Sequence, residues 1–369
     1  MRKHFSLWVC LLLCLFAAAC QSNTPPQNHN AAASPEADPE ANAEPEAETV
    51  TEGGDDSTGE LVVYSGRAET LVQPIIDQFA AATGIRVEVR YGSTTEIAAT
   101  LLEEGENSPA DLFYAQDPGG LGAVEAAGLF SPLPSEILSQ VPARFAAVNG
   151  QWVGISGRAR VVVYNTDVLT EADLPEGIEG FTDPKWAGKI GWAPSNGSFQ
   201  AMVTGMRNVW GEERTRAWLE GVQANNPVVY ENNTAVVAAA GTGEIEVGFV
   251  NHYYLFRFLA EQGDSFPVRN HFIANGGPES LLMVSGAGIL KTAANAVNAE
   301  RFISFLLSVP GQQYFTSQTY EYPLVEGVAV SPLLTPLAEV DAAAADIALN
   351  DLSDLEGTAA LLSELGILP

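Results

Sequence analysis

Apolar residues recur from residue 61 onward with the period of a strand or of a helix, and the two periods alternate. Residues 61–64 form a short apolar run, and residues 85–91 alternate between apolar and polar positions as a half-buried strand does. Between these strands an apolar stripe with helical period covers residues 71–79, and Gly84 stands where a helix often ends. The pattern therefore predicts a strand, a helix and a strand in succession.

The same alternation continues through the rest of the chain. It predicts an α/β fold with a mostly parallel sheet, helices on both faces and ligand-binding loops at the carboxyl ends of the strands. About 310 residues are enough for two such lobes, and we expect a cleft between them. The further elements predicted are helices at 94–104 and 212–222, a helical stretch ending near Gly128, and strands at 111–115, 161–164, 189–192 and 244–250.

The first twenty residues have the pattern of an export signal. Arg2 and Lys3 precede an apolar run over residues 5–19, and small residues lead directly to Cys20. We expect cleavage before Cys20 and a lipid on its sulfur, because the other two cysteines leave with the signal and an exported protein with one cysteine needs a reason for it. Ordinary cleavage, which would release a free protein, is the alternative.

Residues 20–59 are rich in Ala, Pro and Glu and contain almost nothing that could be buried. From Gln21 to Glu60 the chain has ten acidic residues and no Lys or Arg, so we expect a disordered tether. The net charge of the whole chain is −29, which argues against a nucleic-acid partner. We expect an exported protein that touches the outer face of the cytoplasmic membrane, in the periplasm or at the cell surface, only through its anchor.

Motifs of enzymes are missing from this sequence. It has no HExxH, no Walker loop, no GxSxG and no CxxC, and the chain after the signal keeps only His29, His252 and His271. We therefore expect a binding protein. An exported hydrolase that uses carboxylates of the cleft is the remaining enzymatic alternative.

Tyr253 and Tyr254 are the sharpest candidates for chemistry. They follow Asn251 and His252 at the end of an apolar strand. Two adjacent tyrosines inside a strand would face opposite ways, so acting together requires the strand to end there. Phenolates are hard oxygen donors suited to a trivalent metal. The alternatives are aromatic packing for the pair and a structural or rim position for His252.

From Leu61 onward the chain resembles the ferric-iron-binding proteins of bacterial iron ABC importers. This resemblance implies a two-lobed periplasmic-binding-protein fold of type II, a Venus flytrap with a hinge and an interlobe cleft, in which Tyr253 and Tyr254 bind iron. It also implies a monomer that delivers Fe(III) to an ABC importer permease. The matching stretches are 63–66 (VYSG), 108–114 (SPADLFY), 156–164 (SGRARVVVY), 184–186 (PKW), 193–199 (APSNGSF), 251–254 (NHYY) and 321–324 (EYPL).

The resemblance further implies a synergistic anion, phosphate or carbonate, that completes the iron coordination. Its binding residues would be Ser195, Asn196, Gly197, Ser198 and Asn233. Backbone N–H groups and small hydroxyls at the start of a helix suit such an anion. The alternative is that this loop is only a turn that caps a helix.

Two positions depart from the family pattern. Many relatives carry a His after the first strand and a Glu after the Phe-Tyr strand, and these positions hold Ala68 and Gln116 here. The remaining candidates for contacts from the first lobe are Arg67, Gln116 and Asp117. The departures leave open a second function, the binding of another solute such as an oxyanion, a phosphonate or a small organic acid, with the tyrosines only lining the pocket.

Arg158 and Arg160 fall where the chain should pass from one lobe to the other. They are candidates for balancing the charge of the anion, and we expect one of them to form a structural ion pair. By the resemblance, residues 60–160 with 284–335 form the first lobe, and residues 161–283 with 336–369 form the second.

Overall fold

The computed structural model describes residues 59–368, which belong to one compact unit. The predicted signal peptide, the lipid attachment at Cys20 and the tether up to residue 58 lie outside the described residues. The strands are β1 Glu60–Ser65, β2 Arg86–Tyr91, β3 Leu112–Ala115, β4 Val153–Asn165, β5 Ile190–Trp192, β6 Val228–Val229, β7 Val247–Asn251, β8 Val268–His271, β9 Leu282–Ile289 and β10 Tyr322–Pro323.

These strands form one connected sheet whose two ends differ from its centre. The order is β2-β1-β3-β9-β4-β7-β5-β6, with β8 and β10 also paired to β4. At the ends the pairs are parallel, β1 with β2 and β3 in one half and β5 with β6 and β7 in the other. Every pair that includes β4 or β9 is antiparallel. The prediction of a mostly parallel sheet is therefore wrong at the centre, where these two strands join the halves.

Strand β4 passes through both halves of the sheet. Its residues 153–159 pair with β9, and its residues 160–164 pair with β7. All thirteen residues are buried, whereas the sequence pattern predicted only residues 161–164 as a strand. The earlier part was missed because Ser156, Arg158 and Arg160 interrupt the apolar run. Alternation along the strand places these three side chains on the same face.

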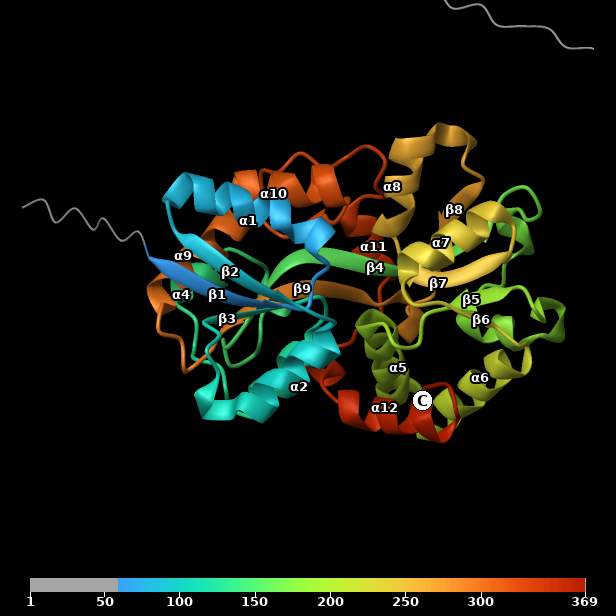
Figure 1. Ribbon diagram of the computed structural model, residues 1–369. Coiled ribbons are helices and arrows are strands. Elements are labelled where there is room, and N and C mark those ends of the chain that lie inside the picture. Colours follow the sequence, from blue (N-terminus) through green and yellow to red (C-terminus); the bar gives the residue numbers. More distant parts are fainter. Residues whose placement is uncertain (1–58, 369) are drawn as a thin grey trace, which may run out of the picture. The chain divides into compact units, whose positions relative to one another are not determined.

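Helices cover both faces of each half, as Figure 1 shows for α1, α9 and α10 against α2 and for α7 and α8 against α5, α6 and α12. Within residues 59–368 no helix is long and apolar enough to cross a membrane. The helices are α1 Glu69–Thr83, α2 Thr94–Glu104, α3 Pro118–Ala126, α4 Ser135–Leu138, α5 Gly197–Trp210, α6 Glu212–Ala224, α7 Asn233–Thr242, α8 Tyr253–Gln262, α9 Ala296–Leu307, α10 Val309–Tyr314, α11 Leu337–Ala343 and α12 Leu355–Glu364.

Local signals explain why several helices begin and end as predicted. Helix α2 starts after a capping box, in which the Ser93 hydroxyl accepts from the Glu96 N–H and the Glu96 carboxylate accepts from the Ser93 N–H. Helix α1 ends at Gly84, whose φ of 74° is the left-handed conformation that glycine adopts without strain. The predicted bounds of α2 are confirmed to the residue.

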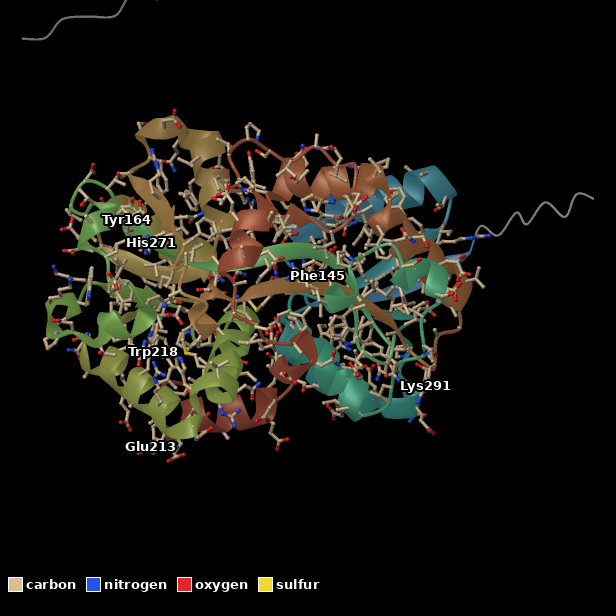
Figure 2. The ribbon with its side chains drawn as sticks, turned by 180° about the vertical axis from the view of Figure 1, so that it is seen from behind. Phe145, Tyr164, Glu213, Trp218, His271 and Lys291 are labelled. Atoms are coloured by element: carbon tan, nitrogen blue, oxygen red, sulfur yellow. The ribbon has the colours of Figure 1, made fainter. Side chains whose placement is uncertain are left out.

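Apolar side chains pack in two cores. The larger one contains Phe145 and extends to the tyrosine pair, and the smaller one surrounds Trp218 in the second half (Figure 2). Helix α12 adds two leucines to the smaller core, and its Thr358 hydroxyl lies 2.7 Å from that of Thr204 on α5. Just before α12, the Asn350 amide donates to Glu125 on α3, so the C-terminal segment contacts both halves. The lobe boundaries remain a prediction.

Candidate functional site

A cavity of about 380 Å³ opens where loops from the two halves meet. It lies at the carboxyl ends of β1, β2, β3 and β5, which is where an open α/β sheet binds ligands. Its lining comes from the first half at Gly66, Ala68, Gly92, Ser93, Thr94, Glu96, Gln116 and Asp117, and from the second half at Ser195, Asn196, Gly197, Glu231, Asn232 and Tyr254.

Tyr253 and Tyr254 lie where strand β7 gives way to helix α8. The strand ends at Asn251 and the tyrosines are the first two residues of the helix, so both side chains face the same region. Their rings stack with centroids 4.3 Å apart, and both residues are buried. The Tyr253 hydroxyl has no hydrogen-bond partner in the described part of the chain. Burial, and then Tyr253, raises the pKa of Tyr254, which keeps its phenol protonated at neutral pH.

His252, directly before the pair, is a structural residue. Its Nδ1 accepts from the Ala159 N–H at 3.2 Å, which leaves Nε2 to donate to the carbonyl of Tyr320 at 2.9 Å. The ring also stacks on Tyr322, with centroids 4.7 Å apart. Burial lowers the pKa of His252 to about 4, so the imidazole is neutral. Both ring nitrogens are occupied, which confirms the structural alternative.

Three buried arginines surround the tyrosine pair, and one of them has a carboxylate partner. Arg67, in the loop after β1, places Nη2 2.7 Å from Oε1 and 2.9 Å from Oε2 of Glu321. Neither side chain is exposed, and the Ser156 hydroxyl donates to the same carboxylate at 2.8 Å. Burial opposes the charge of Arg67, but Glu321 and then Tyr114 and Tyr253 outweigh it and raise its pKa. This ion pair joins the loop after β1 to the segment that leads into β10.

Arg158 and Arg160 have no such partner. No carboxylate of residues 59–368 lies within 4.0 Å of either guanidinium, so the predicted structural ion pair is wrong for both and is made by Arg67 instead. Arg160 donates from Nη1 to the Asn251 amide oxygen at 3.0 Å. Burial lowers the pKa of Arg160 to about 9, and Arg158 lowers it as well, while the nearby phenols act in the opposite direction. Two like charges therefore lie buried side by side.

Most polar groups around the start of α5 already form hydrogen bonds within the protein. Asn196 is the N-cap, and its amide oxygen accepts from the Ser198 N–H at 3.1 Å. The buried Ser198 hydroxyl accepts from Asn251 at 3.1 Å and from Gln116 at 3.5 Å, so it links the two halves. Ser195 is exposed at the edge of the cavity. Asn196 therefore caps α5, and its contact with an anion stays a prediction.

Asn233, the other residue that the resemblance assigns to the anion, is the first residue of α7 and is buried. The preceding Asn232 caps this helix by accepting from the Ala235 N–H. The Asn233 amide nitrogen is without a hydrogen-bond partner in residues 59–368. This donor therefore remains free.

Asp117 is the buried carboxylate of the first half. It stands before α3 and lies against Gly197 of α5 so closely that a Cβ at Gly197 would overlap its Oδ2. Neither oxygen has a hydrogen-bond partner in the described chain. Burial raises the pKa of Asp117, against the opposite effect of Arg158 and of the nearby backbone N–H groups of Gly119 and Gly120. Ala68 and Gln116 also reach the cavity, whereas Arg67 is turned to Glu321.

Sequence reasoning missed two carboxylates that line the cavity, Glu96 of α2 and Glu231 before α7. Their signal was the capping box for Glu96 and the adjacency to Asn232 and Asn233 for Glu231. It also missed the role of Glu321, although this residue lies in a stretch that matches relatives. The described residues contain no group of three or more His, Cys, Asp or Glu side chains that could hold a metal ion.

Comparisons with known proteins agree with this arrangement. A family model described as bacterial extracellular solute-binding protein matches residues 74–344. The chain is 33% identical over 311 residues to the major ferric iron-binding protein of Neisseria meningitidis, a match that covers 84% of this chain and 93% of the relative. It is also 33% identical to the Fe(3+)-binding periplasmic protein of Serratia marcescens, with 84% and 90% covered.

Solved structures give the same result. Iron-bound HitA from Pseudomonas aeruginosa superposes with a TM-score of 0.79 at 34% identity, over 83% of this chain and 99% of that one. A Trichodesmium protein in complex with iron and citrate has a TM-score of 0.68 at 27% identity, over 84% and 99%. The fold is therefore the two-lobed periplasmic-binding-protein fold. The chain belongs to the bacterial extracellular solute-binding protein family, among its ferric-iron-binding periplasmic members.

Proposed function

We propose that this protein captures ferric iron in the interlobe cleft, with the phenolates of Tyr253 and Tyr254 as ligands, and delivers it to the permease of an ABC importer. The observation that carries the proposal is the pair of buried, stacked phenols at the start of α8, in which the Tyr253 hydroxyl has no hydrogen-bond partner among the described residues. A buried hydroxyl without a partner costs free energy, and a cation that displaces its proton removes this cost. The protein is a transport component and not an enzyme.

Ferric iron suits this site because of its high positive charge. A trivalent cation displaces phenol protons at neutral pH although an unperturbed tyrosine has a pKa near 10. Arg67 and Arg160 are close enough to both phenols to interact with their charge, and Arg158 to that of Tyr254. The guanidinium groups offset the negative charge that two phenolates and an anion bring into the cleft.

Further ligands come from a synergistic anion and from the first lobe. Asp117 is our proposed carboxylate ligand, because it is buried at the cavity and its oxygens have no partner in the described chain. Gln116 fills the position of a glutamate in many relatives and is a neutral amide that contacts Ser198. An exogenous oxyanion, phosphate or carbonate, completes the coordination on the side of the cavity lined by Ser195, Asn196 and Gly197, with the buried Ser198 and Asn233 as its further contacts.

Residues 20–59 would keep the binding protein at the membrane. A lipid on Cys20 and the acidic tether keep the binding protein next to its permease on the outer face of the cytoplasmic membrane, as a monomer. At roughly 5 to 6 Å times the square root of its length in residues, such a tether leaves the lobes free to turn some tens of Å from the membrane. Globomycin treatment of producing cells, with Cys20→Ser as the control, tests the anchor by the accumulation of unprocessed precursor.

Absorbance titration of the iron-free protein with ferric citrate, with and without phosphate or carbonate, tests the iron site. We expect a visible phenolate-to-iron charge-transfer band that is lost in Tyr253→Phe and in Tyr254→Phe and strengthens with the anion. Tyr164→Phe is the matched control, because Tyr164 lies on β4 in the second lobe (Figure 2) and does not line the cavity. This variant should keep the full band.

The absence of a band under every anion condition would contradict the iron assignment. Binding of an oxyanion, a phosphonate or a small organic acid, with the tyrosines only lining the pocket, would then become the function to pursue. A band that survives in both single variants would show iron bound elsewhere on the chain.

A further inference from the structure

After β10 the chain passes from the first half of the molecule to the second. Strand β10 pairs with the first part of β4, whereas α12 packs against α5 and adds leucines to the smaller core (Figure 1). On the way, a short 3-10 helix at Leu349–Leu352 lies against α3 of the first half. We call residues 349–364, which comprise this turn and α12, the C-terminal strap. The strap therefore contacts both halves away from the central strands of the sheet.

The contacts of the strap with the second half include an ion pair, hydrogen bonds and apolar packing. Asp354, the N-cap of α12, lies 2.8 Å from the Arg207 guanidinium on α5. The Thr358 hydroxyl lies 2.7 Å from that of Thr204 and also accepts from Arg207 at 3.1 Å. Two leucines of α12 are buried in the smaller core. We therefore expect the strap to move together with α5.

On the first half, the strap lies on a glycine face of α3. A Cβ at Gly122 would overlap the side chain of Ser353, and a Cβ at Gly119 would overlap that of Leu355. Glycine in a helix interior destabilises the helix relative to alanine. The close approach of the strap gives a packing reason for Gly122, because a larger side chain there would push the strap away.

Asn350 makes the polar contact between the strap and the first half. Its amide nitrogen lies 3.2 and 3.1 Å from the two carboxylate oxygens of Glu125 on α3, and its amide oxygen accepts from the Val148 N–H at 3.4 Å. The same carboxylate accepts from Asn149 at 2.7 Å and from the indole of Trp152 at 2.6 Å. Two donors of the first half thus hold Glu125 in place, and Asn350 is the donor that the strap supplies.

The strap bridges the two helices that begin at the walls of the cleft. Helix α3 starts directly after Asp117 and α5 starts at Gly197, and these two residues lie against each other. Opening the cleft moves the two helix starts apart. A strap bound to both helices opposes this movement. We expect its contacts on α3 to break first, because the ion pair and the apolar core hold it on α5.

We propose that the C-terminal strap is a latch on α3, and that the contact of Asn350 with Glu125 sets how readily the cleft opens. A latch of this kind slows the release of a bound cargo without touching it. The inference rests on the proposed function only where iron release is the readout, because the opening itself can be measured without iron.

Two measurements test the latch: small-angle X-ray scattering of the purified iron-free protein, and the release of bound iron to an excess of chelator. In Asn350→Ala we expect a larger radius of gyration and iron release about threefold to tenfold faster, the range for the loss of a half-buried hydrogen bond. Gly122→Ala should act in the same direction, because its Cβ displaces Ser353. The charge-transfer band should keep its wavelength, since neither variant changes an iron ligand.

Asn149→Ala is the matched control for Asn350→Ala. It removes an amide that donates to the same carboxylate from within the first half, so the radius and the release rate should equal those of the wild type. Asn350→Asp should open the cleft at least as far as Asn350→Ala does, because two carboxylates would then face each other across the latch.

Equal radii and equal release rates in Asn350→Ala, Gly122→Ala and the wild type would overturn the inference. Equally fast release in Asn149→Ala and Asn350→Ala would also overturn it, since Glu125 would then act only within the first half. The two proposals fail separately. A radius that responds to Asn350→Ala without any iron band removes only the iron site, and a tyrosine-dependent band with unchanged radius and release removes only the latch.

Discussion

Arg67 and Arg160 are both buried arginines beside the same pair of tyrosines, but their surroundings differ. Arg67 is held by Glu321, which also accepts a hydrogen bond from Ser156. Arg160 has one hydrogen bond, to the neutral amide of Asn251, and its nearest charged neighbours include Arg158. Each guanidinium has two nitrogens without a hydrogen-bond partner in residues 59–368. The difference is therefore the counter-charge, which Arg67 has in Glu321 and Arg160 lacks among the described residues.

This difference distinguishes a buried charge that stabilises the fold through a partner from one that has no opposite charge in the described part of the protein. A buried ion pair joins two elements and neutralises its own charge, whereas a buried cation without an opposite charge makes the protein less stable. The same reasoning applies to the oxygen atoms, since the Glu321 carboxylate is engaged and the Asp117 carboxylate has no partner in residues 59–368. All four of these residues are buried, so burial by itself does not distinguish the paired charges from the unpaired ones.

The largest expected effect comes from Glu321→Gln, which leaves Arg67 as a buried cation without a counter-charge. We expect a loss of about 3 to 5 kcal/mol in the free energy of unfolding, measured by urea denaturation followed by tryptophan fluorescence. The double variant Arg67→Met, Glu321→Gln should recover much of this loss. A small effect in the single variant would mean that this site tolerates an unpaired arginine generally, and the comparison would fail.

Gly197→Ala should weaken iron binding by about tenfold, equivalent to about 1.4 kcal/mol. The new Cβ would overlap the Asp117 carboxylate and force apart the two walls of the cleft. Competition with a chelator such as citrate measures the change. Gly205→Ala on the same helix is the control, because its Cβ would meet only ordinary contacts at 3.4 Å or more. Equal affinities in both variants would mean that Asp117 moves aside without cost.

Arg160→Met should stabilise the iron-free and anion-free protein by about 1 kcal/mol, because it removes a buried charge that lacks a partner. Arg67→Met should do the opposite, since it leaves Glu321 unpaired. Thermal unfolding in a buffer without phosphate or carbonate measures both. A loss of several kcal/mol in Arg160→Met would show that Arg160 is structural, and the distinction between the two arginines would disappear.

The smallest effect concerns an exposed pair. Asp354 lies 2.8 Å from Arg207 and caps α12 by accepting from the Gly357 N–H. Asp354→Asn keeps a capping oxygen and loses only a mostly exposed charge, so we expect a cost below about 1 kcal/mol that shrinks as salt is added. Urea denaturation at low and high ionic strength checks this. A larger loss of unfolding free energy that does not depend on salt would show that the exposure of a charged side chain does not predict its contribution to stability in this protein.

The elements that the sequence predicted well have strong local signals. Helix α2 has a capping box at its start and a glycine at its end, and both are readable from neighbouring residues. Tyr253 and Tyr254 were predicted to stand at a strand end because two adjacent tyrosines cannot act together inside a strand, and β7 does end at Asn251. Their role as iron ligands stays a prediction.

Other features depend on partners that lie far away in the sequence. The polar residues of β4 concealed the first part of this strand, and only its pairing with β9 makes it continuous. The sequence made Arg67 a candidate for a contact from the first lobe and predicted an ion pair for Arg158 or Arg160, because no residue near them in the sequence indicates their true neighbours. Glu321 is 254 residues from Arg67, and the fold alone brings the two together.

By itself, the sequence determined the alternating α/β elements, the family and the tyrosine pair, because periodicity, caps and motifs are local properties of the chain. The tertiary structure decided which buried charges are neutralised within the protein. That distinction depends on distances of a few Å between segments that are remote in sequence, since a buried charge is stable only where an opposite charge or a hydrogen-bond partner reaches it. Arg67 has such a partner in Glu321, and Arg158 and Arg160 have no carboxylate partner among the described residues.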